Sequence, residues 1–307
     1  MLYEYAVDPE ITRREVAELQ HLFALFGLDR GRYISKFPER RWLRLAYQAV
    51  AGRPEVEKKR IEILLGRAKS DKLFFSYRNY DPNIGWSDNV VAEHTARPFQ
   101  AIIAEEADPG VAAWVASENV DEGHELFACA PTCRVPRTAA AIAEKLAPIA
   151  MAGNRFVLVD PYLDLRNLKG QDHRSTIREL LGLLAANGLE NVTLELHWRT
   201  HDTRPPESFV VSHASGWCKG ILPAGYKLEI YEWSERQGGE DFHDRFFLTD
   251  AGGVVVGAGF EVIGAHEQVQ IGLLAPADVA SHLADLDPAN GAFDLVFGPV
   301  IVESDQA

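Results

Sequence analysis

The chain has 307 residues, of which 47% are hydrophobic and 25% are charged, so it is large enough for one large or two ordinary folded domains. No basic stretch followed by an apolar run opens the sequence, and no segment reaches the roughly 18 apolar residues of a membrane span, so we expect a cytoplasmic protein without a membrane partner. The presence of only three cysteines argues against a disulfide framework.

The net charge of −14 is spread unevenly along the chain. Residues 1–78 hold 16 Lys and Arg against 11 Asp and Glu, whereas the rest is strongly acidic. Cations alternate with aromatic residues in this basic part, a mixture that suits phosphate contact and base stacking in a nucleic acid. The plainer interpretation is amphipathic helices with solvated cations and buried aromatic rings. The residues concerned are Arg30, Arg32, Lys36, Arg40, Arg41 and Arg44, interleaved with Tyr33, Phe37, Trp42 and Tyr47.

The first part of the chain is expected to be a mainly helical domain over residues 1–150. Its apolar residues recur at three- and four-residue spacing, which is typical of amphipathic helices. Residues 76–89 are rich in turn formers and predict a loop. The expected helices cover residues 9–27, 38–50, 54–68, 90–105 and 138–152.

From residue 151 to residue 307 the pattern changes to strand, helix, strand, which predicts an α/β domain with a mixed sheet. The turn at residues 250–253 predicts that the strands before and after it pair as a hairpin. Helices are expected at residues 174–187 and 206–219. The expected strands cover residues 155–160, 192–198, 227–233, 243–249, 254–256 and 269–274.

The sharpest local pattern is a histidine and an arginine two residues apart at the start of the expected hairpin. On a strand, His243 and Arg245 would point to the same face and could converge on one oxyanion. Histidine can attack phosphorus, and a fixed cation can offset charge on the non-bridging oxygens. Asp250, at the strand end, could orient a ring or an arginine, or simply form the turn. The plain alternative is the solvated polar end of an ordinary strand.

These residues also carry a family resemblance. His243-x-Arg245-x4-Asp250, then six residues and Gly257-Ala-Gly-Phe, resembles the His-x-Lys-x4-Asp motif and trailing Gly-Ser-x-Asn of the phospholipase D superfamily. The resemblance covers about 150 residues and implies a phospholipase D-like fold for the second domain. The run is also similar to the phospholipase D-like C-terminal domain of microtubule-interacting-and-trafficking proteins, a branch that is thought to bind rather than cleave.

The chain departs from the family pattern at three positions. Arg245 replaces the lysine, Ala258 replaces the hydroxyl residue and Phe260 replaces the asparagine, so two groups that help to hold the phosphate are missing. An arginine in place of the lysine favours binding over turnover, because guanidinium binds phosphate as a bidentate fork but is bulkier than an ammonium group. Superfamily active sites take one motif from each of two lobes, so a single-motif enzyme would have to be a homodimer.

The resemblance implies roles for further residues. Glu267 could hold His243 in one tautomer, Gly257 and Gly259 could approach the phosphate, and Asp160 and His197 could line the cleft. The alternative for Asp160 is an ordinary turn, and the alternative for His197 is a solvated loop end. His124, Cys129 and Cys133 have spacing that could ligate zinc, but no fourth ligand is evident, so we expect neither a metal nor another cofactor.

Two functions remain open at this point. The first is a metal-independent phosphodiesterase, above all a nuclease, that works through a phosphohistidine in a homodimer. The second is a catalytically silent module that binds nucleic acid, a phosphorylated ligand or a protein partner. A lipid-directed enzyme is disfavoured, because an acidic domain is repelled by anionic bilayers. Similar single-motif proteins occur among bacterial DNA-processing and antiviral defence components, a context that rests on the resemblance alone.

Overall fold

The computed structural model describes residues 1–75, 77–166, 168 and 172–304. The chain divides into two compact units, Met1–Pro131 and Thr132–Ala307, each built from helices and one sheet, so the α/β class is confirmed. The division falls earlier than the expected boundary near residue 150, because the helix at Ala139–Ala152 packs within the second unit. None of the helices in the described ranges is long and apolar enough to span a bilayer.

The first unit contains a sheet that the sequence did not predict. Its five strands are all parallel and have the spatial order β3-β2-β1-β4-β5. The prediction of a mainly helical domain omitted this sheet, although helices make up more of the unit than strands do and most of the predicted helices are present. The strands are very short and are buried on both faces, so their apolar runs lack the alternation that marks a half-exposed strand. They are β1 (Tyr3–Val7), β2 (Arg32–Ser35), β3 (Leu73–Phe74), β4 (Ala101–Ala104) and β5 (Trp114–Ala116).

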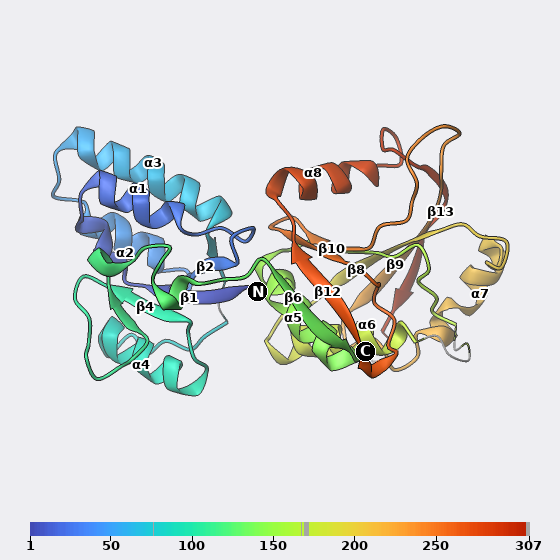
Figure 1. Cartoon of the computed structure of the whole chain (residues 1–307), viewed down its shortest axis with the longest axis horizontal. Helices are drawn as coiled ribbons and strands as arrows, with labels where there is room; N and C mark the ends of the chain where they lie inside the picture. Colours follow the sequence, from blue (N-terminus) through green and yellow to red (C-terminus); the bar gives the residue numbers. More distant parts are fainter. Residues whose placement is uncertain (76, 167, 169–171, 305–307) are drawn as a thin grey trace. The chain divides into compact units, whose positions relative to one another are not determined.

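Helices cover both faces of this sheet (Figure 1). One face packs a core that contains Tyr5, Ile34 and Leu65, together with the apolar sides of three helices. The other face packs a smaller core around Phe37 and Val90. Most of the cover comes from α1 (Val16–Ala24), α2 (Trp42–Ala49) and α3 (Glu55–Asp71) on the first face and α4 (Trp86–Ala96) on the second, with short 3-10 turns at η1 (Pro9–Arg13), η2 (Ser117–Asn119) and η3 (Glu125–Phe127).

The second unit is built on an eight-stranded mixed sheet with the order β13-β9-β8-β7-β10-β11-β12-β6. Among the pairings of its described strands, β7 with β8 and β8 with β9 are parallel and the rest are antiparallel. The predicted hairpin is confirmed, since β10 and β11 pair antiparallel around the expected turn. The strands are β6 (Thr132–Arg137), β7 (Phe156–Val159), β8 (Thr193–Arg199), β9 (Lys227–Ser234), β10 (Phe246–Thr249), β11 (Gly253–Val256), β12 (Gly264–Leu273) and β13 (Asp294–Glu303).

The helices that the structure describes in the second unit pack on this sheet (Figure 1). Each helix turns an apolar side toward the sheet or a neighbouring helix. In the helix at Arg174–Ala186 this side consists of Ile177, Leu180, Leu181 and Leu184, which recur at three- and four-residue spacing and are buried. The helix nearest the N-terminus of the unit begins where the Thr138 hydroxyl accepts a hydrogen bond from the Ala141 N–H. The helices are α5 (Ala139–Ala152), α6 (Arg174–Ala186), α7 (Glu207–Trp217) and α8 (Pro276–Asp285).

Candidate functional site

The His-x-Arg pattern lies just before β10 rather than on it. β10 begins at Phe246, so the prediction that His243 and Arg245 share one face of a strand is wrong. The reason is the length of the neighbouring strand, because β7 ends at Val159, the partner of Phe246. The segment before β10 therefore lies at the carboxyl end of β7, the edge at which open α/β sheets bind their ligands.

The Arg245 side chain is held by a carboxylate, a carbonyl and an aromatic ring. Its Nε lies 3.7 Å from Asp160 Oδ1, and one terminal nitrogen donates a hydrogen bond to the Gly257 carbonyl at 3.4 Å. The guanidinium carbon lies 5.2 Å from the centre of the Tyr162 ring. With a quarter of its side chain exposed, Arg245 is a fixed cation at the rim of this edge.

Asp160, predicted to bind substrate, is instead buried among protein groups. Its Oδ1 accepts a hydrogen bond from the Tyr162 N–H at 2.9 Å, and its Oδ2 accepts one from the Phe260 N–H at 3.2 Å. His173 Nε2 lies 4.0 Å from Oδ2, and burial lowers the pKa of His173 although Asp160 opposes the shift. Asp160 therefore joins the loop after β7 to the turn after β11 and positions Arg245, without reaching a ligand itself.

His243 is the most open member of the pattern. Its ring lies 3.3 Å from the Asp241 carbonyl and 3.4 Å from the Asp244 carboxylate, and nearly two thirds of its side chain is exposed. Among the described residues it forms no hydrogen bond with Arg245. The imidazole is thus accessible to a ligand, and the groups near its nitrogens are the exposed carbonyl and carboxylate of its own segment.

Asp250 lies at the opposite end of β10 from His243 and Arg245. It accepts hydrogen bonds from the backbone N–H groups of Asn154 and Arg155, at 2.6 and 3.2 Å. Partial burial of Asp250 favours its neutral form, but these hydrogen bonds outweigh that effect and lower its pKa. A four-residue strand is about 13 Å long, so Asp250 cannot join a reaction centre with the other two residues. The predicted trio is not brought together, and Asp250 acts as the turn residue.

Glu267 and His197 also lie away from the pattern. Glu267 is exposed on β12, in a stretch where the pairing with β6 is interrupted, and it makes no contact with His243 in the part of the chain that the structure describes. His197 is buried in the middle of the sheet, where its Nδ1 accepts a hydrogen bond from Trp233 Nε1 at 2.9 Å. Burial lowers the pKa of His197 although Glu195 opposes the shift. Neither residue can act as the sequence predicted.

The glycine turn after β11 lets the backbone approach Asp160 and Arg245 closely. Gly259 has a φ of +80°, and a Cβ there would lie 2.6 Å from Asp160 Oδ2 and 2.9 Å from Arg245 Cδ. A side chain is therefore excluded at Gly259, whereas a Cβ at Gly257 would meet only ordinary contacts. Phe260, at the position of the family asparagine, is fully buried and offers no polar group to a ligand.

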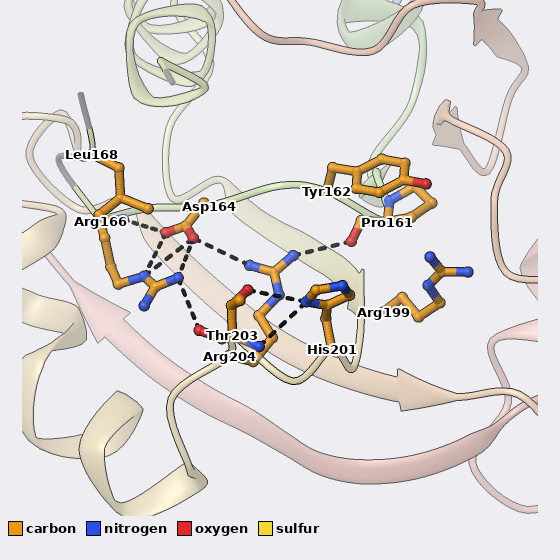
Figure 2. Close-up of a pocket in the computed structure, with 9 residues that line it drawn as sticks. All are labelled: Pro161, Tyr162, Asp164, Arg166, Leu168, Arg199, His201, Thr203 and Arg204. Carbon is orange, nitrogen blue, oxygen red and sulfur yellow. Dashed lines mark hydrogen bonds and ion pairs between the residues drawn. The ribbon is translucent and has the colours of Figure 1, made fainter. Parts of the chain in front are cut away.

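A pocket of about 460 Å³ opens beyond the carboxyl ends of β7 and β8 (Figure 2). Three arginines line it from two loops, Arg166 after β7 and Arg199 and Arg204 at and after the end of β8. The Tyr162 ring lies at its edge, 5.7 Å from the Arg199 guanidinium and also against Arg245. The pocket and the His-x-Arg segment thus share one aromatic ring. The remaining lining residues are Pro161, Asp164, Leu168, His201 and Thr203.

Asp164 organises the arginines of this pocket. It forms a bidentate pair with Arg166, with distances down to 2.7 Å, and this hydrogen bonding raises the pKa of Arg166. Figure 2 shows the Arg204 guanidinium between Asp164 and the Pro161 carbonyl. Arg199 pairs with Glu235 at 3.0 Å. Arg166 and Arg199 keep about a quarter of their side chains exposed, so both have N–H groups left for an anionic ligand.

The sequence did not reveal these arginines, because the loops that carry them are more than 30 residues apart in the chain. They meet only because β7 and β8 are parallel neighbours, so that both loops leave the sheet at the same edge. The signal in the sequence that could have indicated this pocket is an arginine shortly after each of two consecutive predicted strands.

The six basic residues of the first unit do not form one surface. Arg30 and Arg32 lie at the amino end of β2, where Arg32 is buried and donates a hydrogen bond to the Phe127 carbonyl. Lys36, Arg40 and Arg41 lie beyond the carboxyl end of the same strand. Arg44 is exposed on α2. Tyr33, Phe37 and Trp42 are buried as the plainer interpretation expected, although only Trp42 lies on a helix.

The chain matches no protein-family model and no curated protein. The described residues also hold no group of three or more His, Cys, Asp or Glu side chains arranged to bind a metal ion.

Proposed function

We propose that the second unit is a phospholipase D-like module that binds a phosphate-bearing ligand in the arginine-lined pocket. The single observation that carries the proposal is the convergence of Arg166, Arg199 and Arg204 beyond the carboxyl ends of two parallel strands. Three guanidinium groups and one carboxylate line the pocket, so the lining has an excess of positive charge in an otherwise acidic chain. Guanidinium groups match the geometry of phosphate oxygens through paired N–H donors.

Pocket size also supports this ligand class. A volume of about 460 Å³ suits a small phosphorylated molecule or the phosphorylated end of a chain. The Tyr162 ring, half exposed at the pocket edge, offers a flat apolar surface beside the cations. A terminal phosphate attached to a nucleoside fits both features.

Binding is favoured over hydrolysis by the surroundings of the His-x-Arg segment. Asp250 is at the far end of β10, Ala258 and Phe260 supply no polar side chain, and the charge of Arg245 is partly offset by Asp160. Few groups are therefore fixed around His243 to stabilise charge in a transition state.

Hydrolysis of a phosphodiester is a second candidate, and one observation favours it. The His243 imidazole is exposed, and its segment shares Tyr162 with the arginines of the pocket through Arg245. In that case His243 is the nucleophile that forms a phosphohistidine, and a second copy of the chain supplies the histidine that protonates the leaving oxygen.

The test of binding is calorimetric titration with a 5′-phosphorylated thymidine dinucleotide and with the same dinucleotide ending in a hydroxyl group. We expect the phosphorylated probe to bind at least about tenfold more tightly, since hydrogen bonds to charged groups contribute about 1.5–3 kcal/mol each. The Arg166→Gln/Arg199→Gln double variant should lose this preference. Arg178→Gln, which removes an exposed arginine from α6, is the matched control and should keep it. Equal binding of both probes by the parent chain would exclude the proposal.

The test of hydrolysis uses labelled single- and double-stranded DNA and RNA in the presence of EDTA. Cleavage by the parent chain that is lost in His243→Ala would establish the second candidate. Absence of cleavage, or equal cleavage by both proteins, would reject His243 as the nucleophile.

A further inference from the structure

The carboxyl edge of the parallel sheet in the first unit has features of a binding surface in its own right. β2 and β3 are parallel neighbours, and the Lys36 N–H donates a hydrogen bond to the Phe74 carbonyl at 2.9 Å, so the segments after both strands leave the sheet together. Ligands of open parallel sheets bind outside this edge. The surface discussed below consists of Lys36, Arg40, Arg41, Phe75 and Tyr77 and is called the β2–β3 edge.

Cations and aromatic rings are in contact at the β2–β3 edge. Lys36 Nζ lies 4.3 Å from the centre of the Phe75 ring, and the Phe75 and Tyr77 rings are 6.4 Å apart. More than a third of Phe75 is exposed, and Arg40 and Arg41 are exposed on the segment that follows β2. Glu39 is the carboxylate that acts on both Lys36 and Tyr77, and Lys69 adds a further positive charge beside Lys36. This edge therefore combines positive charge with accessible aromatic surface.

The backbone of the same edge adopts unusual conformations. Arg40 has a φ of +61° and Tyr77 a φ of +49°, and these are two of the three non-glycine residues with positive φ among those described. Such conformations cost energy in residues with a side chain, and they concentrate at sites where a side chain must be held in a required direction. Both strained residues belong to the surface that carries the exposed cations and rings.

We infer that the β2–β3 edge binds single-stranded nucleic acid, with Lys36, Arg40 and Arg41 on the phosphates and with Phe75 and Tyr77 against unstacked bases. Phosphate contact and base stacking are the two interactions by which proteins hold single strands without sequence preference. Charge favours this ligand, because the edge brings three cations together in a chain whose net charge is −14. Bases in a duplex are stacked on one another, so the rings should discriminate against double strands.

The experiment measures fluorescence anisotropy of a 20-nucleotide thymidine oligonucleotide with the full chain at 50 and 200 mM salt. The Arg40→Gly/Arg41→Gln variant should bind at least about tenfold more weakly at 50 mM salt, and its log–log salt dependence should be shallower by about 1.4, or about 0.7 for each lost phosphate contact. Glycine accepts a positive φ, so the change at Arg40 does not endanger folding. Phe75→Ala should weaken binding by at least about fivefold, through loss of stacking.

The matched control is Arg30→Gln, which removes an exposed cation from the opposite end of β2 and should leave binding unchanged. Equal loss in Arg30→Gln, binding of a 20-base-pair duplex as tight as that of the single strand, or no binding by the parent chain would overturn the inference. The Arg166→Gln/Arg199→Gln variant separates this site from the pocket of the second unit. It should bind the oligonucleotide like the parent chain, and loss of binding in that variant alone would assign the single strand to the pocket instead.

Discussion

The two units use arginine in opposite ways. In the first unit, Arg78 is almost fully buried and donates hydrogen bonds to both Glu4 oxygens, to the Glu93 carbonyl and to the Arg97 carbonyl, while its guanidinium lies 3.5 Å above the Phe99 ring. In the second unit, the pocket residues Arg166 and Arg199 are paired with carboxylates but remain partly exposed. A buried guanidinium that spends most of its N–H groups on the protein holds the fold, whereas an exposed one with several unused N–H groups can hold a ligand. Burial and the count of unused donors separate these roles better than charge does.

The largest effect on stability should come from breaking the buried ion pair between Arg78 and Glu4. Arg78→Met removes the hydrogen-bonded partner of Glu4 in a nearly dry site and leaves it the partly exposed Arg97 at 3.9 Å, so we expect a loss of about 3–5 kcal/mol in the free energy of unfolding. Urea denaturation measures it. The Glu4→Gln/Arg78→Met double variant is the control, since removing both charges should restore part of the loss. A single variant as stable as the parent chain would contradict the structural role of Arg78.

A smaller effect is expected at the turn of the second unit. Asp250→Ala leaves the Asn154 and Arg155 N–H groups without their acceptor, and it should lower the free energy of unfolding by about 1–3 kcal/mol. Because the pKa of Asp250 is lowered in the folded state, its contribution is present above its ordinary pKa of 3.8 and is lost as the pH falls through the folded value. Phosphate binding at pH 7 should not change. A loss of dinucleotide binding in a folded Asp250→Ala protein would restore Asp250 to the site.

The two buried histidines, His173 and His197, predict a modest dependence of stability on pH. Burial lowers the pKa values of His173 and His197, so below pH 6.5 the unfolded chain binds protons more readily than the folded one. Thermal stability should therefore fall as the pH drops from 7 to 5, a range above that in which Asp250 titrates. Replacing His197 by Gln should flatten the profile, while replacing the exposed His243 by Gln should leave its slope unchanged. Identical slopes in all three proteins would show that His197 is not the cause.

The smallest effect on stability is expected in the pocket. Arg199→Gln removes a partly exposed pair with Glu235, and surface pairs of this kind contribute at most about 1 kcal/mol. The contrast with Arg78→Met sharpens the comparison, because the pocket variant should lose ligand binding while keeping its stability. A destabilisation of Arg199→Gln as large as that of Arg78→Met would show that Arg199, like Arg78, mainly stabilises the fold.

The sequence predicted the elements whose patterns are local. The hairpin of β10 and β11 follows from its glycine turn, and α6 follows from its apolar stripe. The parallel sheet of the first unit was missed because strands of two to five residues that are buried on both faces have no alternation. The candidate site could be predicted only in part. Arg245 belongs to a local sequence motif, whereas the proximity of Arg166 and Arg199 depends on the pairing of β7 with β8, which the sequence does not show.

The turn at Gly259 has a consequence for how this protein can change over time. Any side chain at that position would collide with both Asp160 and Arg245, so substitutions at the three positions should be coupled in evolution. A lineage that keeps the ion pair must keep the glycine, whereas Gly257, two residues earlier, is free to drift. Among diverged relatives, an invariant second glycine beside a variable first one would mark those that still hold Arg245 in place.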